Sequence, residues 1–367
     1  MSFQNHLRLV SVASLSLTLT LAAHADSFVQ TNLVSNVPGL AAHTDSNLIN
    51  PWGMSFSGTS PFWTSNQGTG TATLYDGAGT PQALVVSIPG STAGPSGPTG
   101  QVFNGGTGFQ LNGSPSRFIF ANLNGTISAW NGSGTTASVV ATTPGAIYTG
   151  LAISGNNLYA ANSLGTINVF NSSFAPTTLA GNFTDPNLPA GFHPYNVQAI
   201  GSTVYVTYAQ LGPGGAPMAG GFVDAFNADG TFAQRIASGG PLFAPWGITL
   251  APSTFGAFGG DLLIGNFGSG MIDAFSTTGA FLGALLGPDG QPLVNSGLWA
   301  LDFRTGGANV NTNALYITAG INGEQGGLFA AIAPATPEPS SLILAGSGLA
   351  ALATLLLRRN FTAAQAN

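Results

Sequence analysis

Few side chains in this sequence could act as acids, bases or nucleophiles. The 367 residues include no cysteine, 4 histidines and 12 acidic residues. Without cysteine, disulfides, thiolate metal sites and cysteine nucleophiles are excluded. Between residues 26 and 335 the histidines are His43 and His193, and the single glutamate is Glu324. No Gly-rich phosphate loop, paired-histidine helix or nucleophile elbow is present, so we predict no catalytic residue.

Four aspartates have structural interpretations. Asp76 and Asp229 lie in Gly-containing hairpin turns, where a short carboxylate caps its own backbone. Asp224 and Asp273 stand at equivalent places in a repeat, each two residues before an aromatic residue. Because equivalent residues of a repeat do not generally converge, we expect this pair to be buried and hydrogen-bonded rather than catalytic.

A set of amide side chains and one histidine offers a better candidate site. We expect these residues to share one face around a central channel: Asn50, Asn66, Asn122, Asn162, His193, Asn196 and Asn266. With the nearby Trp52, Trp246 and Trp299, the amides could bind a sugar or polar polymer through hydrogen bonds and stacking. Their oxygens could also ligate Ca²⁺, although carboxylates are sparse there. The alternative is structural, with asparagines capping strand ends and tryptophans packing between sheets.

The elements that would position these residues form a sixfold repeat. The three clearest copies begin with an aromatic, then a small residue, then alternating apolar positions, as in Pro245-Trp246-Gly247-Ile248, and three weaker copies follow the same plan. The small residue serves as an anchor, and successive anchors are 46 to 53 residues apart. The six anchors are Gly53, Gly100, Gly150, Asn196, Gly247 and Ala300.

Each copy continues with three more short segments of strand composition. A second apolar run is followed by a glycine that opens a third run, which ends on an aromatic in the first five copies, such as Gly70 to Tyr75. A polar turn and a fourth apolar run follow, for example Ala83 to Ile88 or Phe281 to Leu285. Four antiparallel strands at this period are the signature of a β-propeller blade.

The ends of the repeat predict how the ring closes. The sixth copy has three strands, and an unassigned strand from Phe28 to Val34 precedes the first copy. If that strand fills the fourth place in the last blade, no sheet edge is left open there. We therefore predict an all-β, six-bladed propeller of four-stranded blades over residues 26–333.

Both termini read as segments outside the propeller. Arg8 precedes an apolar stretch that ends in Ala23-His24-Ala25, which predicts a signal peptide over 1–25 cleaved after Ala25. A Pro-rich linker over 334–340 contains Pro337-Glu338-Pro339. Residues 341–359 combine an uncharged apolar stretch with Arg358-Arg359, which predicts a membrane helix and a cytoplasmic tail over 360–367.

This tail resembles the PEP-CTERM sorting signal of Gram-negative bacteria: a Pro-Glu-Pro motif, an apolar helix and a basic end. The resemblance implies processing by a membrane enzyme, an exosortase, and an inner-membrane-anchored precursor that reaches the cell surface or medium. Pro337, Glu338, Pro339, Arg358 and Arg359 would be its recognition residues. The alternative is a plain C-terminal anchor.

The repeat resembles the NHL-type propeller repeat, most clearly from Pro245 through Asn266 to Phe275, and the body is similar to uncharacterised bacterial PEP-CTERM propellers. At the second-strand end the family usually has Asp and then Asn and Arg, whereas here Asn stands in the Asp place and the Arg is missing. That departure argues against the basic binding face of some NHL proteins.

The low content of charged residues and the sorting tail together favour a surface binding protein. There is no lysine, only six arginines, and the formal net charge is −6, which argues against nucleic-acid binding. The first hypothesis is a non-enzymatic binding or matrix protein that contacts exopolysaccharide or surface proteins and needs no cofactor. The second is a propeller hydrolase or lyase with a channel-bound divalent cation, similar to lactonase or streptogramin-lyase propellers.

Overall fold

The structure is a computed structural model that describes residues 27–89 and 97–335. The predicted signal peptide, the Pro-Glu-Pro motif, the membrane helix and the tail lie outside these residues. Within the described ranges, no helix is long and apolar enough to cross a membrane. Two single turns of 3-10 helix are present, η1 (Pro213–Gly215) and η2 (Gly256–Phe258).

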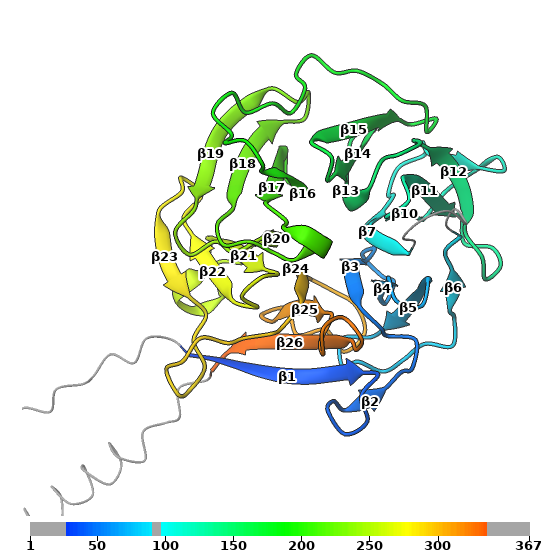
Figure 1. Ribbon diagram of the computed structural model, residues 1–367. Coiled ribbons are helices and arrows are strands. Elements are labelled where there is room, and N and C mark those ends of the chain that lie inside the picture. Colours follow the sequence, from blue (N-terminus) through cyan, green and yellow to red (C-terminus); the bar gives the residue numbers. More distant parts are fainter. Residues whose placement is uncertain (1–26, 90–96, 336–367) are drawn as a thin grey trace, which may run out of the picture.

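Six antiparallel sheets are arranged around a central axis as the blades of a propeller, as predicted (Figure 1). The innermost strands, from blade one to blade six, are β3 (Pro51–Ser55), β7 (Pro98–Phe103), β13 (Tyr148–Ser154), β16 (His193–Ile200), β20 (Pro245–Leu250) and β24 (Leu298–Phe303). The second strands are β4 (Phe62–Asn66), β10 (Phe118–Asn122), β14 (Asn157–Asn162), β17 (Thr203–Ala209), β21 (Leu262–Asn266) and β25 (Leu315–Ala319).

The outer parts of the blades vary more than the inner parts. The third strands are β5 (Thr71–Tyr75), β11 (Thr126–Trp130), β15 (Thr166–Asn171), β18 (Phe222–Asn227), β22 (Ile272–Phe275) and β26 (Leu328–Pro334). The fourth strands are β6 (Val86–Ser87), β12 (Ser138–Thr142), β19 (Phe232–Ser238), β23 (Phe281–Ala284) and β1 (Phe28–Ser35). Three two-residue strands, β2 (His43–Thr44), β8 (Gln110–Leu111) and β9 (Ser114–Pro115), lie in connections.

The small anchor residues of the repeat are explained by the crowding of innermost strands at the axis. A Cβ added to Gly53 would collide with the carbonyl oxygen of Thr99 in the next blade, and one at Gly100 with the backbone nitrogen of Leu151. These contacts are backbone contacts that cannot yield, so a side chain at either position would push the blades apart. The anchor residue is therefore small at these positions because neighbouring innermost strands lie in close backbone contact.

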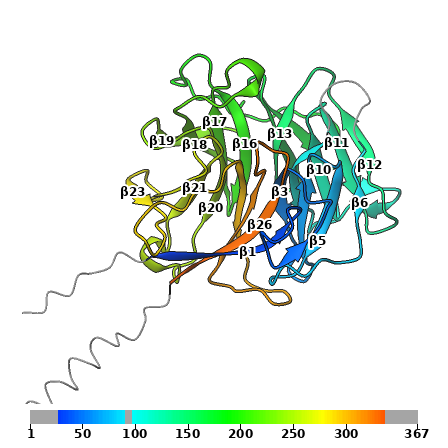
Figure 2. The same ribbon diagram turned by 60° about the horizontal axis from the view of Figure 1, so that its bottom comes forward.

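The chain closes the ring by pairing its two ends in blade six. Strand β1 pairs antiparallel with β26, from Phe28 opposite Pro334 to Ser35 opposite Leu328. Both views show the two strands side by side (Figures 1 and 2). This confirms the prediction that the N-terminal strand completes the last blade.

Blade three departs from the four-strand prediction. Its sheet contains β13, β14 and β15 only, and residues after Thr177 leave the fourth place. Blade one also has less fourth strand than expected, since β6 covers two residues of the predicted Ala83–Ile88. Innermost and second strands are instead complete in every blade, because neighbouring blades bury both of their faces.

The hydrophobic core is divided among the interfaces between neighbouring blades. Between blades one and two, Trp63 stacks on Phe118 with ring centroids 4.1 Å apart. Between blades five and six, Leu263 and Ile272 pack in one cluster with Leu298. Every blade thus depends on both neighbours for burial, which makes closure of the ring a condition for stability.

Candidate binding channel

Aromatic side chains close one end of the central channel. We call this end the start face, because the innermost strands begin there. Trp52 stacks on Trp299 with centroids 3.6 Å apart, and Trp299 stacks on Phe267 at 4.2 Å. Trp246 meets Trp52 and Trp299 edge-on at 6.3 and 5.7 Å. The three tryptophans are 7% exposed or less, so they pack on one another and offer no open stacking surface.

Hydrogen bonds to the indole groups fix this aromatic plug. Trp299 Nε1 donates to Asn50 Oδ1 at 3.0 Å, and Trp246 Nε1 donates to the carbonyl of Thr149, two blades away, at 3.0 Å. Bonds that join different blades hold the ring at a fixed diameter. The structural interpretation of the tryptophans therefore fits their positions.

The channel widens toward the opposite end, which we call the end face. Its middle holds a void of about 20 Å³, roughly the space of one water molecule. The mouth is a cavity of about 260 Å³. Both are lined by Met54, Gln101, Gln198 and Asp302, and the rim of the mouth includes Phe56, Phe103 and Ile153. The accessible part of the channel therefore lies opposite the predicted amide ring.

Asp302 is the single carboxylate in the mouth. It lies on β24, two residues after the blade-six anchor, and its Oδ1 accepts the N–H of Phe303 at 2.8 Å. Burial raises the pKa of Asp302 to about 7, and the hydrogen bonds from Phe303 and from the Thr249 hydroxyl only partly offset this. No Lys, Arg or His lines either part of the channel. The carboxylate thus lacks a cationic partner in the cavity that it faces.

Gln101 supplies a second acceptor. Its Nε2 donates to the carbonyls of Gly53 and Trp63, which leaves Oε1 buried with no hydrogen-bond partner. A buried carbonyl oxygen without a partner costs about 1–3 kcal/mol. A donor placed in the channel would recover part of that cost. Gln198, also in the lining, is half-buried.

The nearest guanidinium belongs to Arg304 and is already engaged. It lies 4.9 Å from the ring centroids of both Phe56 and Phe62, and it donates to the carbonyls of Ser57 and Ser60. Arg304 is 2% exposed, so it supports the rim from behind rather than facing the cavity.

The predicted strand-end asparagines are buried and hydrogen-bonded within their blades. Asn66, Asn122, Asn162 and Asn266 are the last residues of β4, β10, β14 and β21. In Asn266, Oδ1 accepts the N–H of Phe243 at 2.8 Å, and Nδ2 donates to Asp273 Oδ2 at 2.8 Å. Asn162 likewise accepts the N–H of Ile147 at 3.1 Å. All four amides donate to the third strand of their blade, and those of Asn162 and Asn266 also accept an N–H from the preceding loop.

The other three predicted residues have different surroundings. Asn196 is buried and donates to the carbonyl of Trp246 at 2.9 Å, while Asn50 is buried against Gln67 and Trp299. His193, the first residue of β16, is the exposed member of the set of seven. Among the described residues, no group of three or more His, Cys, Asp or Glu could hold a metal ion.

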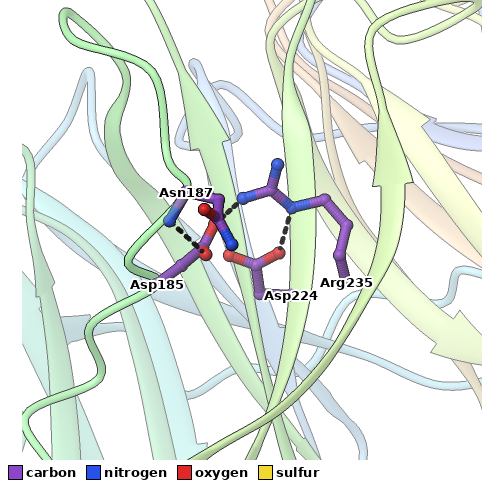
Figure 3. Close-up of polar contacts among 4 residues, drawn as sticks. All are labelled: Asp185, Asn187, Asp224 and Arg235. Atoms are coloured by element: carbon purple, nitrogen blue, oxygen red, sulfur yellow. Dashed lines mark hydrogen bonds and ion pairs between the residues drawn. The ribbon is translucent and has the colours of Figure 1, made fainter.

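A charged cluster lies away from the channel, in blade four (Figure 3). Arg235 on β19 pairs with Asp224 on β18 at 2.7 Å and with Asp185 in the connection from blade three. Asp185 also accepts the N–H of Asn187 at 2.9 Å. Burial acts to raise the pKa of Asp224, and the adjacent guanidinium acts in the opposite direction. Asp224 and Asp273 are both buried, as expected from the sequence.

Sequence reasoning missed Asp302 and Gln101. The available signal was positional: Asp302 stands two residues after its anchor, where Gln198 stands in blade four. Polar side chains at those positions of otherwise apolar innermost strands could have marked the channel lining.

Two relatives match most of the length of this chain. Uncharacterized protein R648 of Acanthamoeba polyphaga mimivirus is 34% identical over 290 residues, covering 73% of this chain and 72% of the viral protein. Uncharacterized protein L690 of the same virus is 33% identical over 291 residues, covering 73% and 77%. The chain belongs to the family of these proteins. The names of these relatives state no activity, so kinship supplies none.

Two further comparisons concern the tail and the fold. Residues 335–359 match the family described as the PEP-CTERM protein-sorting motif, which indicates an exported protein. The WD40 β-propeller domain of Doa1 overlaps with a TM-score of 0.47 at 10% identity, covering 80% of this chain and 94% of that domain. A likeness this loose carries no functional argument.

Proposed function

We propose that this protein is an exported surface binding protein whose channel mouth takes a ligand with an ammonium or similar N–H cation. The observation that carries the proposal is that Asp302 and Gln101, whose Oε1 has no partner, line one cavity without basic side chains. A cationic donor would satisfy both acceptors. Phe56 and Phe103 at the rim add apolar contact surface for the carbon skeleton of the ligand.

The size of the mouth restricts the ligand. A cavity of about 260 Å³ is near the lower limit for small-molecule sites, so it admits a group the size of one sugar residue. The aromatic plug blocks passage through the ring, so a polymer would insert an end or a side group. An amino sugar of an exopolysaccharide has the required ammonium group.

The sorting tail supports the surface location. In the proposal, Pro337-Glu338-Pro339 and Arg358-Arg359 are read by an exosortase-type enzyme of a Gram-negative bacterium, with Ala25 as the signal cleavage site. The apolar stretch over 341–359 would anchor the precursor in the inner membrane before release to the surface or medium.

The amide ring at the start face remains a separate proposal. A sugar or Ca²⁺ there would have to displace hydrogen bonds such as the one that the N–H of Phe243 donates to Asn266 Oδ1, whereas His193 is open to solvent. The hydrolase or lyase alternative needs a ligand set for a divalent cation, and in the described ranges Asp302 has no second carboxylate or histidine in the channel lining.

The test is binding of glucosamine oligomers, compared with their fully N-acetylated counterparts, to the full chain in detergent. We expect the free amines to bind and the acetylated forms to bind at least 10-fold more weakly, because acetylation removes the charge. Asp302→Asn should abolish that difference, whereas the control Asp289→Asn, in an exposed turn, should retain it. Equal binding of both oligomers, or an unaffected Asp302→Asn variant, would rule out the proposed site.

A further inference from the structure

The outer edge of β15 in blade three has no fourth strand paired with it. Because the N–H of Thr177 donates to the carbonyl of Val169 at 2.9 Å, the backbone groups of Val169 point away from β14. Backbone direction alternates along a strand, so the N–H and C=O of Ile167 point to the same outer edge. Among the described residues, no hydrogen bond reaches these groups of Ile167 or the carbonyl of Gly165.

Other blades show what should occupy this edge. In blade one the carbonyl of Gly70, which corresponds to Gly165, accepts the N–H of Ile88 at 2.9 Å. In blade two the carbonyl of Gly125 accepts the N–H of Thr143 at 2.9 Å. The fourth-strand register continues to Ala72 in blade one and Ile127 in blade two, the counterparts of Ile167. The vacancy in blade three thus has a defined direction and register.

Side-chain burial confirms that the fourth place is uncovered. Ile167 is half-buried, whereas its five counterparts in other blades are fully buried: Ala72, Ile127, Val223, Ile272 and Phe329. A groove of about 410 Å³ lies along the edge, lined by Thr143, residues 166–170, residues 176–179 and residues 181–183. A missing strand and an open groove therefore coincide.

Contacts with blade four hold the groove open. After Thr177 the chain is drawn away: the N–H groups of Gly181 and Phe183 donate to the carbonyls of Asp229 and Gly230 at 2.8 and 3.0 Å. The Phe183 ring packs 5.3 Å from both Tyr159 and Phe226. Just beyond, Asp185 is fixed by Arg235 (Figure 3). Since Phe183 and Asp185 are buried and Asp185 is ion-paired, the segment cannot return to complete the sheet without breaking these contacts.

We propose that this edge binds an extended, uncharged peptide segment of a partner protein, which adds as the fourth strand of blade three. Strand addition supplies backbone hydrogen bonds at Ile167 and Gly165. No charged side chain lines the groove, so a charged segment would be desolvated without compensation. The preferred segment is uncharged and made of β-branched and small residues, like β12 in blade two.

The probe is a fluorescent peptide with the sequence of Ser138–Thr143, titrated into the full chain in detergent and followed by polarisation. If the peptide binds β15 in the register that β12 has with β11, the N–H of its last residue would donate to the carbonyl of Gly165. We expect saturable binding, at least 10-fold weaker for the same peptide with Val140→Lys. Ile167→Pro should weaken binding at least 10-fold, because proline removes an outward N–H but no ladder bond to β14. Ile167→Val is the matched control and should bind within twofold of wild type.

Amide hydrogen exchange keeps the proposal testable if Ile167→Pro fails to fold. In the wild-type chain the amide of Ile167 should exchange faster than that of Ile127 and slow at least 10-fold with saturating peptide. Equal binding by the proline and valine variants, or exchange at Ile167 unchanged by peptide, would overturn the proposal. So would a dimer in sedimentation that Ile167→Pro converts to monomer, since a second copy would then occupy the edge.

Discussion

Asparagines at the second-strand ends of blades three and five join the blade to the loop that precedes it. In blade five the amide of Asn266 receives one hydrogen bond from a loop N–H and gives one to a buried carboxylate. Asn fits because it presents an acceptor and a donor within one short side chain. Aspartate in the same place would bring two carboxylates together at Asp273. The departure from the NHL-type pattern is therefore consistent with the blade interior.

Replacing Asn266 should destabilise the propeller. Asn266→Ala leaves the N–H of Phe243 and the carboxylate of Asp273 without these partners, so we expect a loss of about 2–3 kcal/mol in urea unfolding. Asn227→Ala is the control, because its exposed amide donates only to the Thr231 hydroxyl, and it should cost less than about 0.5 kcal/mol. Similar losses for both variants would contradict the capping interpretation.

Asp302 should give the protein a measurable pH dependence. Because its folded pKa is raised to about 7, above the unfolded value, its contribution to stability is complete at low pH and is lost as the pH rises toward 7. Between pH 5 and pH 8 that loss is at most about 3 kcal/mol, from roughly 1.4 kcal/mol per pKa unit. Melting temperatures should therefore fall over this range, and less steeply in Asp302→Asn. A parallel fall in the variant would show that other groups are responsible.

At the scale of the element, β1 acts as the clasp of the ring. Side chains also tie it to the connection before β24, since Gln30 and Asn295 exchange hydrogen bonds of 2.9 and 2.8 Å. Its first residue, Phe28, is fully buried and lies 4.9 Å from Phe255 and 5.9 Å from Phe258. Aromatic packing therefore fixes the N-terminal end of β1.

Adjacent residues of β1 provide a matched test of the clasp. Phe28→Ala removes the aromatic anchor and should cost about 3–5 kcal/mol. Val29→Ala, at a side chain that is 46% exposed, should change the free energy of unfolding by less than about 0.5 kcal/mol. The measurement is thermal and urea unfolding of both variants. Comparable stability of the two would mean that the ring does not depend on this end of β1.

At the scale of the whole molecule, the ring is complete without the sorting tail. The last described backbone bond runs from Ala335 N to Ser27 O at 2.7 Å, immediately after β26 ends. The two ends of the propeller therefore leave the ring at one place, at blade six. A tail that begins there can be processed or anchored with the blades undisturbed.

Two truncations should behave in opposite ways. Removal of residues 336–367 should leave the melting temperature within about 2 °C of the full chain. Removal of residues 1–35 should unfold or aggregate the protein, because it exposes the edge of β26. Circular dichroism melts and size-exclusion profiles of both forms provide the measurement. A stable, monomeric chain without β1 would show that blade six needs only three strands.

The sequence by itself determined the repeat, the blade number and the closure by an N-terminal strand. These features are readable because each follows from a local requirement: small anchors where Gly53 and Gly100 meet the next blade, and an aromatic at the end of a third strand. The buried positions of Asp224 and Asp273 follow from the same equivalence of repeats.

Only the tertiary structure decided which end of the channel is open and which blade is incomplete. The tryptophans look equally suited to binding and to packing until their rings are seen to stack across the axis. Asp302 and Gln101 become a site because strands of different blades converge on one cavity. Blade three loses its fourth strand because Phe183 and Asp185 are held by blade four. Local sequence patterns do not predict such competition between long-range contacts.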